Sequence, residues 1–155
     1  MKSFDSISQL EKYLIQKCKA AVSGTERKVF NAIEKCLVQY YGEFTPEEYI
    51  RTKQLYNSLV KTEVKRVGNG FEAEVYFDLS KLNYEQGVMP LRHTPEHGRY
   101  GWATWTGENV LDTAMKGSHG GYESGTPIWS KSMAILGDIN KLLAQELREL
   151  GVPIR

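Results

Sequence analysis

The sequence predicts a single α+β domain over residues 1–155, in which a long N-terminal helix and a C-terminal helix pack on a small antiparallel sheet with a central β-hairpin. Apolar residues recur at helical spacing near both ends of the chain. Between these regions, two strand-like runs flank the tripeptide Gly68-Asn69-Gly70. A length of 155 residues fits one domain and leaves little room for two.

The first helix is expected from about Ser6 to Tyr41. The tripeptide Ser23-Gly24-Thr25 interrupts the apolar stripe, but the stripe keeps roughly the same phase on both sides, which favours one long helix, straight or bent, over two shorter ones. Gly42 then ends the helix. The stripe consists of residues spaced by three, four, seven or eight positions: Ile7, Leu10, Leu14, Val22, Val29, Ile33, Leu37 and Tyr40.

A second helix is expected to begin within the sequence FTPEEY. Thr45 can cap this helix, Pro46 suits the first helical position, and Glu48 completes a capping box. The helix is expected to continue through EYIRTKQLYNSL and to bury one side, which consists of Tyr49, Ile50 and Leu55.

The clearest strand signal predicts a β-hairpin of about residues 60–67 and 71–78. Asn69-Gly70 is a favoured tight-turn pair because both residue types tolerate positive φ. The second strand alternates between buried and exposed positions, with Phe71, Ala73, Val75 and Phe77 on one face and Glu72, Glu74 and Tyr76 on the other.

The chain beyond the hairpin is predicted to contain a long irregular loop at about residues 80–106 and two further helices. A loop of this length in a small domain is usually functional, or is ordered by a partner. A short helix is expected in TGENVLDTAMKG, with Thr106 as cap and Gly117 as stop. The last helix ends at Gly151, and its apolar face is expected to consist of Trp129, Met133, Leu136, Ile139, Leu143 and Leu147.

The composition excludes several classes of protein. Hydrophobic residues make up 41% and charged residues 25% of the chain, as in ordinary globular domains. A formal net charge of +1, from 20 basic and 19 acidic residues, gives no general attraction to nucleic acid or to an anionic membrane. The N-terminus lacks the apolar run of a signal peptide, and no stretch approaches the ~20 apolar residues that span a bilayer, so we expect a cytoplasmic protein.

Both cysteines are expected to be free, buried thiols. Cys18 and Cys36 lie in the same predicted helix, where a rise of about 1.5 Å per residue separates them by roughly 27 Å. That separation is far beyond the reach of a disulfide, and it agrees with a reducing compartment.

The sharpest enzymatic pattern is HTPEH, residues 93–97. His93, Glu96 and His97 match the H-x-x-E-H spacing of a class of zinc peptidases, in which two histidines on one helical face bind the metal. Pro95 lies between the histidines and opposes a helix there, because proline removes a hydrogen bond and clashes with the preceding turn. A solvated turn is therefore the favoured interpretation of this segment.

The glycine-rich stretch KGSHGGYESGTPIW, residues 116–129, raises the question of an active-site loop. It lacks the Gly-Lys-Ser/Thr of a phosphate-binding loop, and no strand precedes it. His119 could act as a general base with Glu123 nearby, but the sequence identifies neither an orienting partner nor a nucleophile. The favoured interpretation is that the glycines let the chain turn tightly between two helices.

Two further groups of residues could bind partners. Arg51, Lys53, Lys61, Lys65 and Arg66 form a basic stretch, in which strand alternation would put Lys61 and Lys65 on one hairpin face. Glu63 would lie between them, so a solvated face is favoured over a nucleic-acid site. The aromatic residues Tyr100, Trp102 and Trp105 could stack on bases or sugars, but such residues also mark protein contacts.

Two landmarks together resemble a family of neck proteins of tailed bacteriophages, also called tail-completion or minor tail components. The first is YIRTKQLYNSL, with Arg51-Thr52, Leu55 and Ser58 ahead of the hairpin. The second is YESGTPIWSKSM, with Tyr122, Glu123 and Gly125-Thr126 ahead of the C-terminal helix. The resemblance covers residues 5–150. The chain departs from the family pattern at Lys53, where glycine is usual, in the closeness of Tyr122 to Glu123, and in a longer loop at 81–106.

The resemblance implies a structural virion protein that forms a homo-oligomeric ring at the head–tail junction, joins the tail to the head and contacts other neck and tail proteins. Such a ring lets genomic DNA pass without binding its sequence, and a net charge near zero agrees with that role. The implied subunit has no catalytic residue, cofactor or metal and resides in the virion neck after assembly in the host cytoplasm. Two alternatives stay open: a small hydrolase or toxin-like enzyme using His93, His97 or His119, and a cytoplasmic peptide-binding module.

Overall fold

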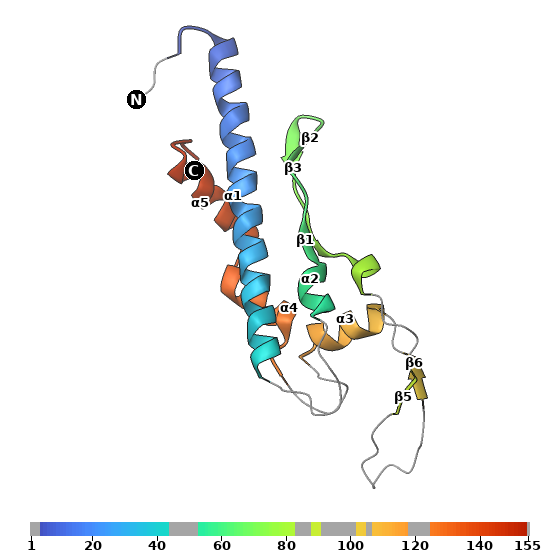
Figure 1. The fold of residues 1–155 in the computed structure, drawn as a ribbon. Coiled ribbons are helices and arrows are strands. Elements are labelled where there is room, and N and C mark those ends of the chain that lie inside the picture. Colours follow the sequence, from blue (N-terminus) through green and yellow to red (C-terminus); the bar gives the residue numbers. More distant parts are fainter. Residues whose placement is uncertain are drawn as a thin grey trace.

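The computed structural model describes residues 4–43, 53–82, 88–90, 102–104, 107–117 and 125–154. Its axis is the helix α1, Ile7–Gly42, whose 36 residues span about 54 Å at the usual rise per residue. C-terminal helices lie along one side of α1, and a narrow β-ribbon lies along another (Figure 1). The predicted α+β class with two helical regions and a small antiparallel sheet region is confirmed.

The prediction of one continuous N-terminal helix is also confirmed, because α1 runs through Ser23-Gly24-Thr25. The glycine has a packing role: a Cβ at Gly24 would collide with the carboxylate of Glu146 from α5, Ile139–Glu149. Glu146 is buried and forms an ion pair of 2.6 Å with Lys28. The interruption in the apolar stripe is therefore the point where α5 approaches α1.

The second helix differs from its prediction. α2, Gln54–Ser58, is short, and it begins after Lys53, which has a left-handed φ of 56°. A continuous helix through position 53 is thus wrong for the described residues, while Thr45, Pro46, Glu48, Tyr49 and Ile50 lie outside them. Leu55 is buried as predicted, and the Tyr56 hydroxyl donates a 2.8 Å hydrogen bond to Glu34 of α1.

The predicted hairpin is present as a ribbon in two parts. β1, Leu59–Lys61, pairs with β4, Val75–Phe77, and β2, Lys65–Val67, pairs with β3, Gly70–Glu72, both antiparallel. Between the two parts, residues 62–64 oppose only residues 73–74, so one extra residue forms a β-bulge. The alternation of partly buried and exposed residues from 71 to 77 follows the prediction.

The turn of the hairpin is shifted by one residue from its prediction. Val67 pairs with Gly70, so Gly68 and Asn69 are the two turn residues rather than Asn69 and Gly70. Among them only Gly68 has positive φ, at 56°. This is the arrangement of hairpin turns that require glycine at the first central position.

The region predicted as irregular contains two short ordered pieces. The 3-10 helix η1, Leu79–Lys81, is capped by the Asp78 carboxylate, which accepts a 3.1 Å hydrogen bond from the Ser80 N–H. Beyond it, β5, Val88–Pro90, pairs antiparallel with β6, Trp102–Thr104. Figure 1 draws this pair beyond α3, away from α1. The region predicted as a loop therefore contains a short β-ribbon. The sequence did not indicate it, because three residues in each strand are too few to show an alternating pattern.

The predicted C-terminal helix is two helices. α4, Ile128–Leu136, ends at Gly137, which has a φ of 67°, and α5 begins after Asp138, whose carboxylate accepts a 2.8 Å hydrogen bond from the Asn140 N–H. The apolar face expected across both helices is also incomplete, because Trp129 and Ile139 are exposed. The apolar residues keep helical spacing across Gly137, although the backbone turns at this residue and α4 ends before it.

The core lies around the C-terminal half of α1. α3, Gly107–Met115, closes it together with α4 and η1, and Gly117 ends α3 as predicted, with a φ of 79°. Cys36 is buried and Cys18 is partly buried, and both are free. The buried members of this core are Ile33, Cys36, Leu37, Leu55, Leu59, Leu82, Ala114 and Ile128.

Candidate functional site

The end of α1 is tied to the segment before α4 by one carboxylate. Glu43 follows the last residue of α1, and its carboxylate accepts a 2.6 Å hydrogen bond from the Thr126 N–H and another from the Thr126 hydroxyl. The Gln39 side-chain amide donates a third, at 2.9 Å. Thr126 is buried. The contact therefore joins two chain segments that are far apart in the sequence.

The same place joins the two ends of a segment, residues 118–124, that lies outside the described residues, and we call that segment the short excursion. Gly117 and Gly125 flank residues 118–124, and the Gly125 N–H donates a hydrogen bond to the Gly117 carbonyl. A Cβ at Gly117 would lie 2.5 Å from the Gly125 carbonyl oxygen and 2.7 Å from the Pro127 nitrogen. The chain therefore leaves and returns at adjacent points, and only glycine allows so close an approach with a φ of 79°.

A second excursion, residues 83–106, is closed in the same way. Gly107, the first residue of α3, lies against Leu82, the last described residue before the excursion. A Cβ at Gly107 would lie 2.9 Å from the Leu82 Cβ and 3.3 Å from its carbonyl oxygen. The long excursion also leaves and returns at one point, and it contains the β5–β6 pair.

Helix α3 connects the two stems, and we call the whole arrangement the loop base: Glu43, Leu82, Gly107, Gly117 and Gly125-Thr126. Gly107, the first residue of α3, forms the stem of the long excursion, and Gly117, which follows α3, forms the stem of the short one. Leu82 and Ala114 belong to the hydrophobic core around Leu37. The described ends of both excursions are therefore anchored on the core.

The electrostatics of the loop base centre on Glu43. The hydroxyl of Thr126, followed by its N–H and the amide of Gln39, holds the pKa of the Glu43 carboxyl below its usual value, while desolvation opposes this. Lys131 acts in the same direction as the hydrogen bonds. Glu43 is therefore an ionised acceptor at neutral pH, and its chemistry here is that of a structural clamp.

The described residues of the two family-like landmarks are structural. Leu55 and Ser58 are both buried, and the Ser58 hydroxyl donates a 2.7 Å hydrogen bond to the Leu55 carbonyl. Lys53 has the left-handed φ that glycine adopts without strain, which explains why a glycine would be usual there. Gly125 and Thr126 close the short excursion. The landmarks thus specify turns and contacts of the frame.

Most of the residues considered for chemistry lie outside the described part of the chain. These are His93, Pro95, Glu96, His97, Tyr100, Trp105, His119, Tyr122 and Glu123, together with Arg51. Within the described ranges, no group of three or more histidine, cysteine or acidic side chains could hold a metal ion. Among the described helices, none combines the length and the apolar character needed to cross a membrane.

The basic stretch of the hairpin does not form one row of solvated cations. The Lys61 ammonium lies 3.3 Å from the buried carboxylate of Glu26 and 5.8 Å from the ring centroid of Phe30. Lys65 lies beyond the bulge and pairs with Glu72 in the strand register. The expected common face of Lys61 and Lys65 is therefore wrong, because Lys61 lies opposite the partly buried Val75 and Lys65 opposite the exposed Glu72, which are on different faces of the alternating strand.

Sequence reasoning missed Glu43, Gly107 and Glu146 as positioning residues. Glu43 follows a helix end, where an acidic residue gives no periodic signal. Gly107 and Glu146 act through contacts with residues distant in sequence, Leu82 and Gly24. A glycine inside an otherwise apolar helical stripe was the one visible signal, because such a residue often marks a close approach.

Comparison with known proteins decides the family. The profile of the YomN family matches residues 6–150. The chain belongs to the YomN family. This is a phage-type family, so the chain is a phage protein. No curated protein and no solved structure matches it.

Membership of the YomN family bears on the whole fold. The matched residues begin at the N-cap of α1 and end directly after α5, so they include the loop base and both excursions. The frame and its two closed stems thus belong to the matched family region as one unit.

Proposed function

We propose that this YomN family member is a structural virion protein of a tailed phage, which forms a homo-oligomeric ring at the head–tail junction and joins the tail to the head. The observation that carries the proposal is the loop base, where two excursions leave the helical frame through closed stems. A ring subunit needs such segments to reach the rings above and below it. The phage-type family supports the viral setting.

The proposed mechanism is assembly without catalysis. The frame of α1, α4 and α5 holds the subunit rigid, and residues 81–106 and 117–127 contact neighbouring proteins when the ring docks. DNA passes through the ring without sequence-specific binding, which agrees with a net charge of +1. The glycines of residues 117–125 support this interpretation because Gly117 and Gly125 close a stem.

The proposal is tested by removing the gene from the phage and examining the particles by electron microscopy. The expected result is DNA-filled heads and separate tails, with the chain detected by mass spectrometry in wild-type particles. Complete, infectious particles formed without the chain would overturn the proposal.

A variant with His93, His97 and His119 all changed to alanine separates this proposal from a histidine-dependent enzyme. Under the assembly proposal, the triple variant restores joined particles to the deletion phage. If the variant forms joined particles that are not infectious, the histidines have a chemical role and the purely structural proposal fails. If it gives separate heads and tails, as the deletion does, the histidines contribute to the contacts of residues 81–106 and 117–127 with neighbouring proteins. Alanine at Trp102 and Trp105 tests the peptide-binding alternative in the same assay.

A further inference from the structure

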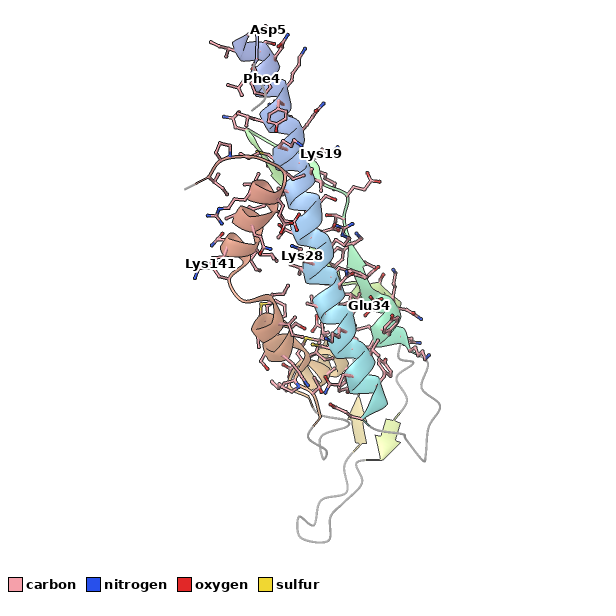
Figure 2. All side chains as sticks on the ribbon, turned by 90° about the vertical axis from the view of Figure 1, so that its left-hand side faces the viewer. Phe4, Asp5, Lys19, Lys28, Glu34 and Lys141 are labelled. Atoms are coloured by element: carbon pink, nitrogen blue, oxygen red, sulfur yellow. The ribbon has the colours of Figure 1, made fainter. Side chains whose placement is uncertain are left out.

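One side of α1 stays exposed between the two parts of the fold that pack on this helix. α5 contacts α1 at Gly24 and Lys28, and the ribbon contacts it at Glu26. Figure 2 shows α5 and the ribbon on either side of α1. Helical geometry groups six exposed residues on the side between these contacts, which we call the open face: Gln16, Ala20, Ser23, Arg27, Asn31 and Val38.

Four exposed basic residues lie on the open face or along its edges. Arg27 lies in the middle of the face. Lys12 and Lys19 lie along the edge nearer the ribbon, and Lys35 lies along the edge nearer the C-terminal helices. We call these four residues the basic row. Within the part of the chain that the structure describes, none of them forms an ion pair, so all four charges are available to a ligand.

The acidic residues of α1 do not cancel the basic row. α1 contains six basic and three acidic residues. Glu11 lies on the opposite side of the helix, and Glu26 is buried against Lys61. Glu34 lies on the open face, where it accepts the hydrogen bond from Tyr56. The four cations of the row therefore share their side of α1 with one carboxylate.

The elements that flank the open face carry no net charge that could offset the row. Residues 59–77 of the ribbon contain three basic and three acidic residues. Residues 128–149, which form α4, the turn and α5, also contain three of each, and Asp138 is among the acidic ones. The excess of positive charge therefore belongs to α1 alone among these three parts of the fold.

The spacing of the basic row suits the phosphate backbone of duplex DNA. From Lys12 to Lys35, α1 rises by about 35 Å, which is close to one turn of B-DNA. Duplex DNA carries one charge per ~1.7 Å of its axis, so this length presents about 20 phosphates to the four cations. So few contacts bind the backbone weakly and without regard to sequence, and they allow the DNA to move along the helix.

The side chains between the cations oppose a membrane surface as the ligand. Gln16, Ser23 and Asn31 are polar and Ala20 is small, whereas a helix that lies on a bilayer inserts large apolar side chains. Val38 is the large apolar residue of the open face, and it lies beyond the last cation. The exposed apolar residues Ile7, Leu10 and Leu14 lie on a different side of α1. The open face therefore offers charge and hydrogen bonds, which a phosphate backbone uses.

We propose that the open face of α1 binds the phosphate backbone of duplex DNA through the basic row and lines the channel of the ring. The inference rests on the proposed ring function and identifies the side of the subunit that faces the passing DNA. Each copy in a ring adds the same sparse row of cations, so the contacts act together around the duplex. The net charge of the whole chain stays near zero because the excess is confined to one side.

Fluorescence anisotropy of a labelled duplex of about 30 base pairs and mixed sequence tests the binding, with the purified full chain titrated at salt concentrations between about 50 and 200 mM. The test variant changes the whole basic row: Lys12→Gln, Lys19→Gln, Arg27→Gln and Lys35→Gln. A matched control removes the same number of exposed charges elsewhere: Lys65→Gln, Arg66→Gln, Lys141→Gln and Arg148→Gln. Circular dichroism checks that both variants keep the fold.

Four phosphate contacts predict that the Kd of the wild type rises by about a hundredfold over this range of salt. At the lowest salt, the test variant should bind at least about tenfold more weakly than the wild type, and the control should stay within about threefold. Two double variants, Lys12→Gln with Lys19→Gln and Arg27→Gln with Lys35→Gln, should each lose about half of the salt dependence. The result thus does not depend on the fold of the fourfold variant.

Three outcomes overturn the inference. The first is a wild-type chain that does not bind the duplex at the lowest salt. The second is a control that loses as much affinity as the test variant, since the total charge would then decide the binding. The third is tighter binding to phosphatidylglycerol vesicles than to the duplex, lost in the test variant, which would make the open face a membrane surface.

Detection of the chain in purified virions distinguishes failure of the inference from failure of the proposed function. A chain that is present in virions but does not bind the duplex retains its virion role and loses the DNA-facing surface. A chain that binds the duplex through the basic row but is missing from virions retains this surface and loses the neck role.

Discussion

Replacing Gly117 with alanine attacks the stem of the short excursion in two ways. The residue has a φ of 79°, and an added Cβ would lie 2.5 Å from the Gly125 carbonyl oxygen, 2.7 Å from the Pro127 nitrogen and 2.9 Å from the Thr126 carbonyl carbon. All three are backbone atoms, so no side-chain rotation relieves the collision. The Glu43–Thr126 contact shares this backbone and is strained with it.

Three other glycines separate the two effects. Gly42 has open space around its Cβ position and no positive φ, so alanine there should stabilise the protein by about 0.5–1 kcal/mol. Gly68 has open space but a φ of 56°, which predicts a loss of about 1 kcal/mol. Gly107 has only the collision with Leu82, which predicts a loss of about 1–2 kcal/mol. For Gly117, both effects together predict a loss of about 2–4 kcal/mol.

Urea unfolding followed by circular dichroism measures these differences as shifts of the midpoint at constant slope. The order of stability should be Gly42→Ala above wild type, then Gly68→Ala and Gly107→Ala, then Gly117→Ala. If Gly117→Ala is as stable as Gly68→Ala, the stem is not closed as described, and the loop base is refuted.

Three further predictions concern other parts of the frame. Lys53→Gly should stabilise the protein by about 0.5–1 kcal/mol, because glycine adopts the left-handed φ of position 53 without strain, whereas Lys53→Ala should give no gain in the same urea assay. Because its hydrogen bonds hold the pKa of Glu43 below the usual value, the stabilisation from Glu43 is present above pH about 4.3 and is lost as pH falls through the lowered pKa. Urea midpoints of wild type and Glu43→Gln should therefore converge between pH 5 and 3, and a gap that stays constant contradicts this. Lys61→Met should lower the free energy of unfolding by about 1–3 kcal/mol, because it leaves the buried Glu26 carboxylate unpaired. Adding Glu26→Leu to this variant should recover most of the lost stability. Failure to recover would show that the ion pair is not what binds the ribbon to α1.

The spacing of apolar residues predicted the long helix, the hairpin and the short third helix, because this spacing is a property of each element's own sequence. The same signal failed at Gly137, where apolar spacing continues through a residue whose φ of 67° ends α4. It also failed at position 53, because a helix-forming lysine occupies a left-handed turn there. In both places the backbone conformation is set by where the next element must pack.

The candidate site was predictable only in outline. The glycine-rich stretch and the long loop were visible in the sequence, but their stems depend on Glu43 meeting Thr126 and on Gly107 meeting Leu82. These pairs are far apart in sequence or separated by an excursion, so no local pattern indicates them. The exposure of Ile7 likewise became known only from the place where α5 stops along α1.

By itself, the sequence determined the class of the fold, the continuity of α1 and the family, because helical and strand spacing and family matching depend on the order of residues. Only the tertiary structure decided which apolar residues are buried and where the chain closes on itself. Burial and backbone contact depend on distances between segments, and those distances exist only once α4, α5 and the ribbon have packed on α1.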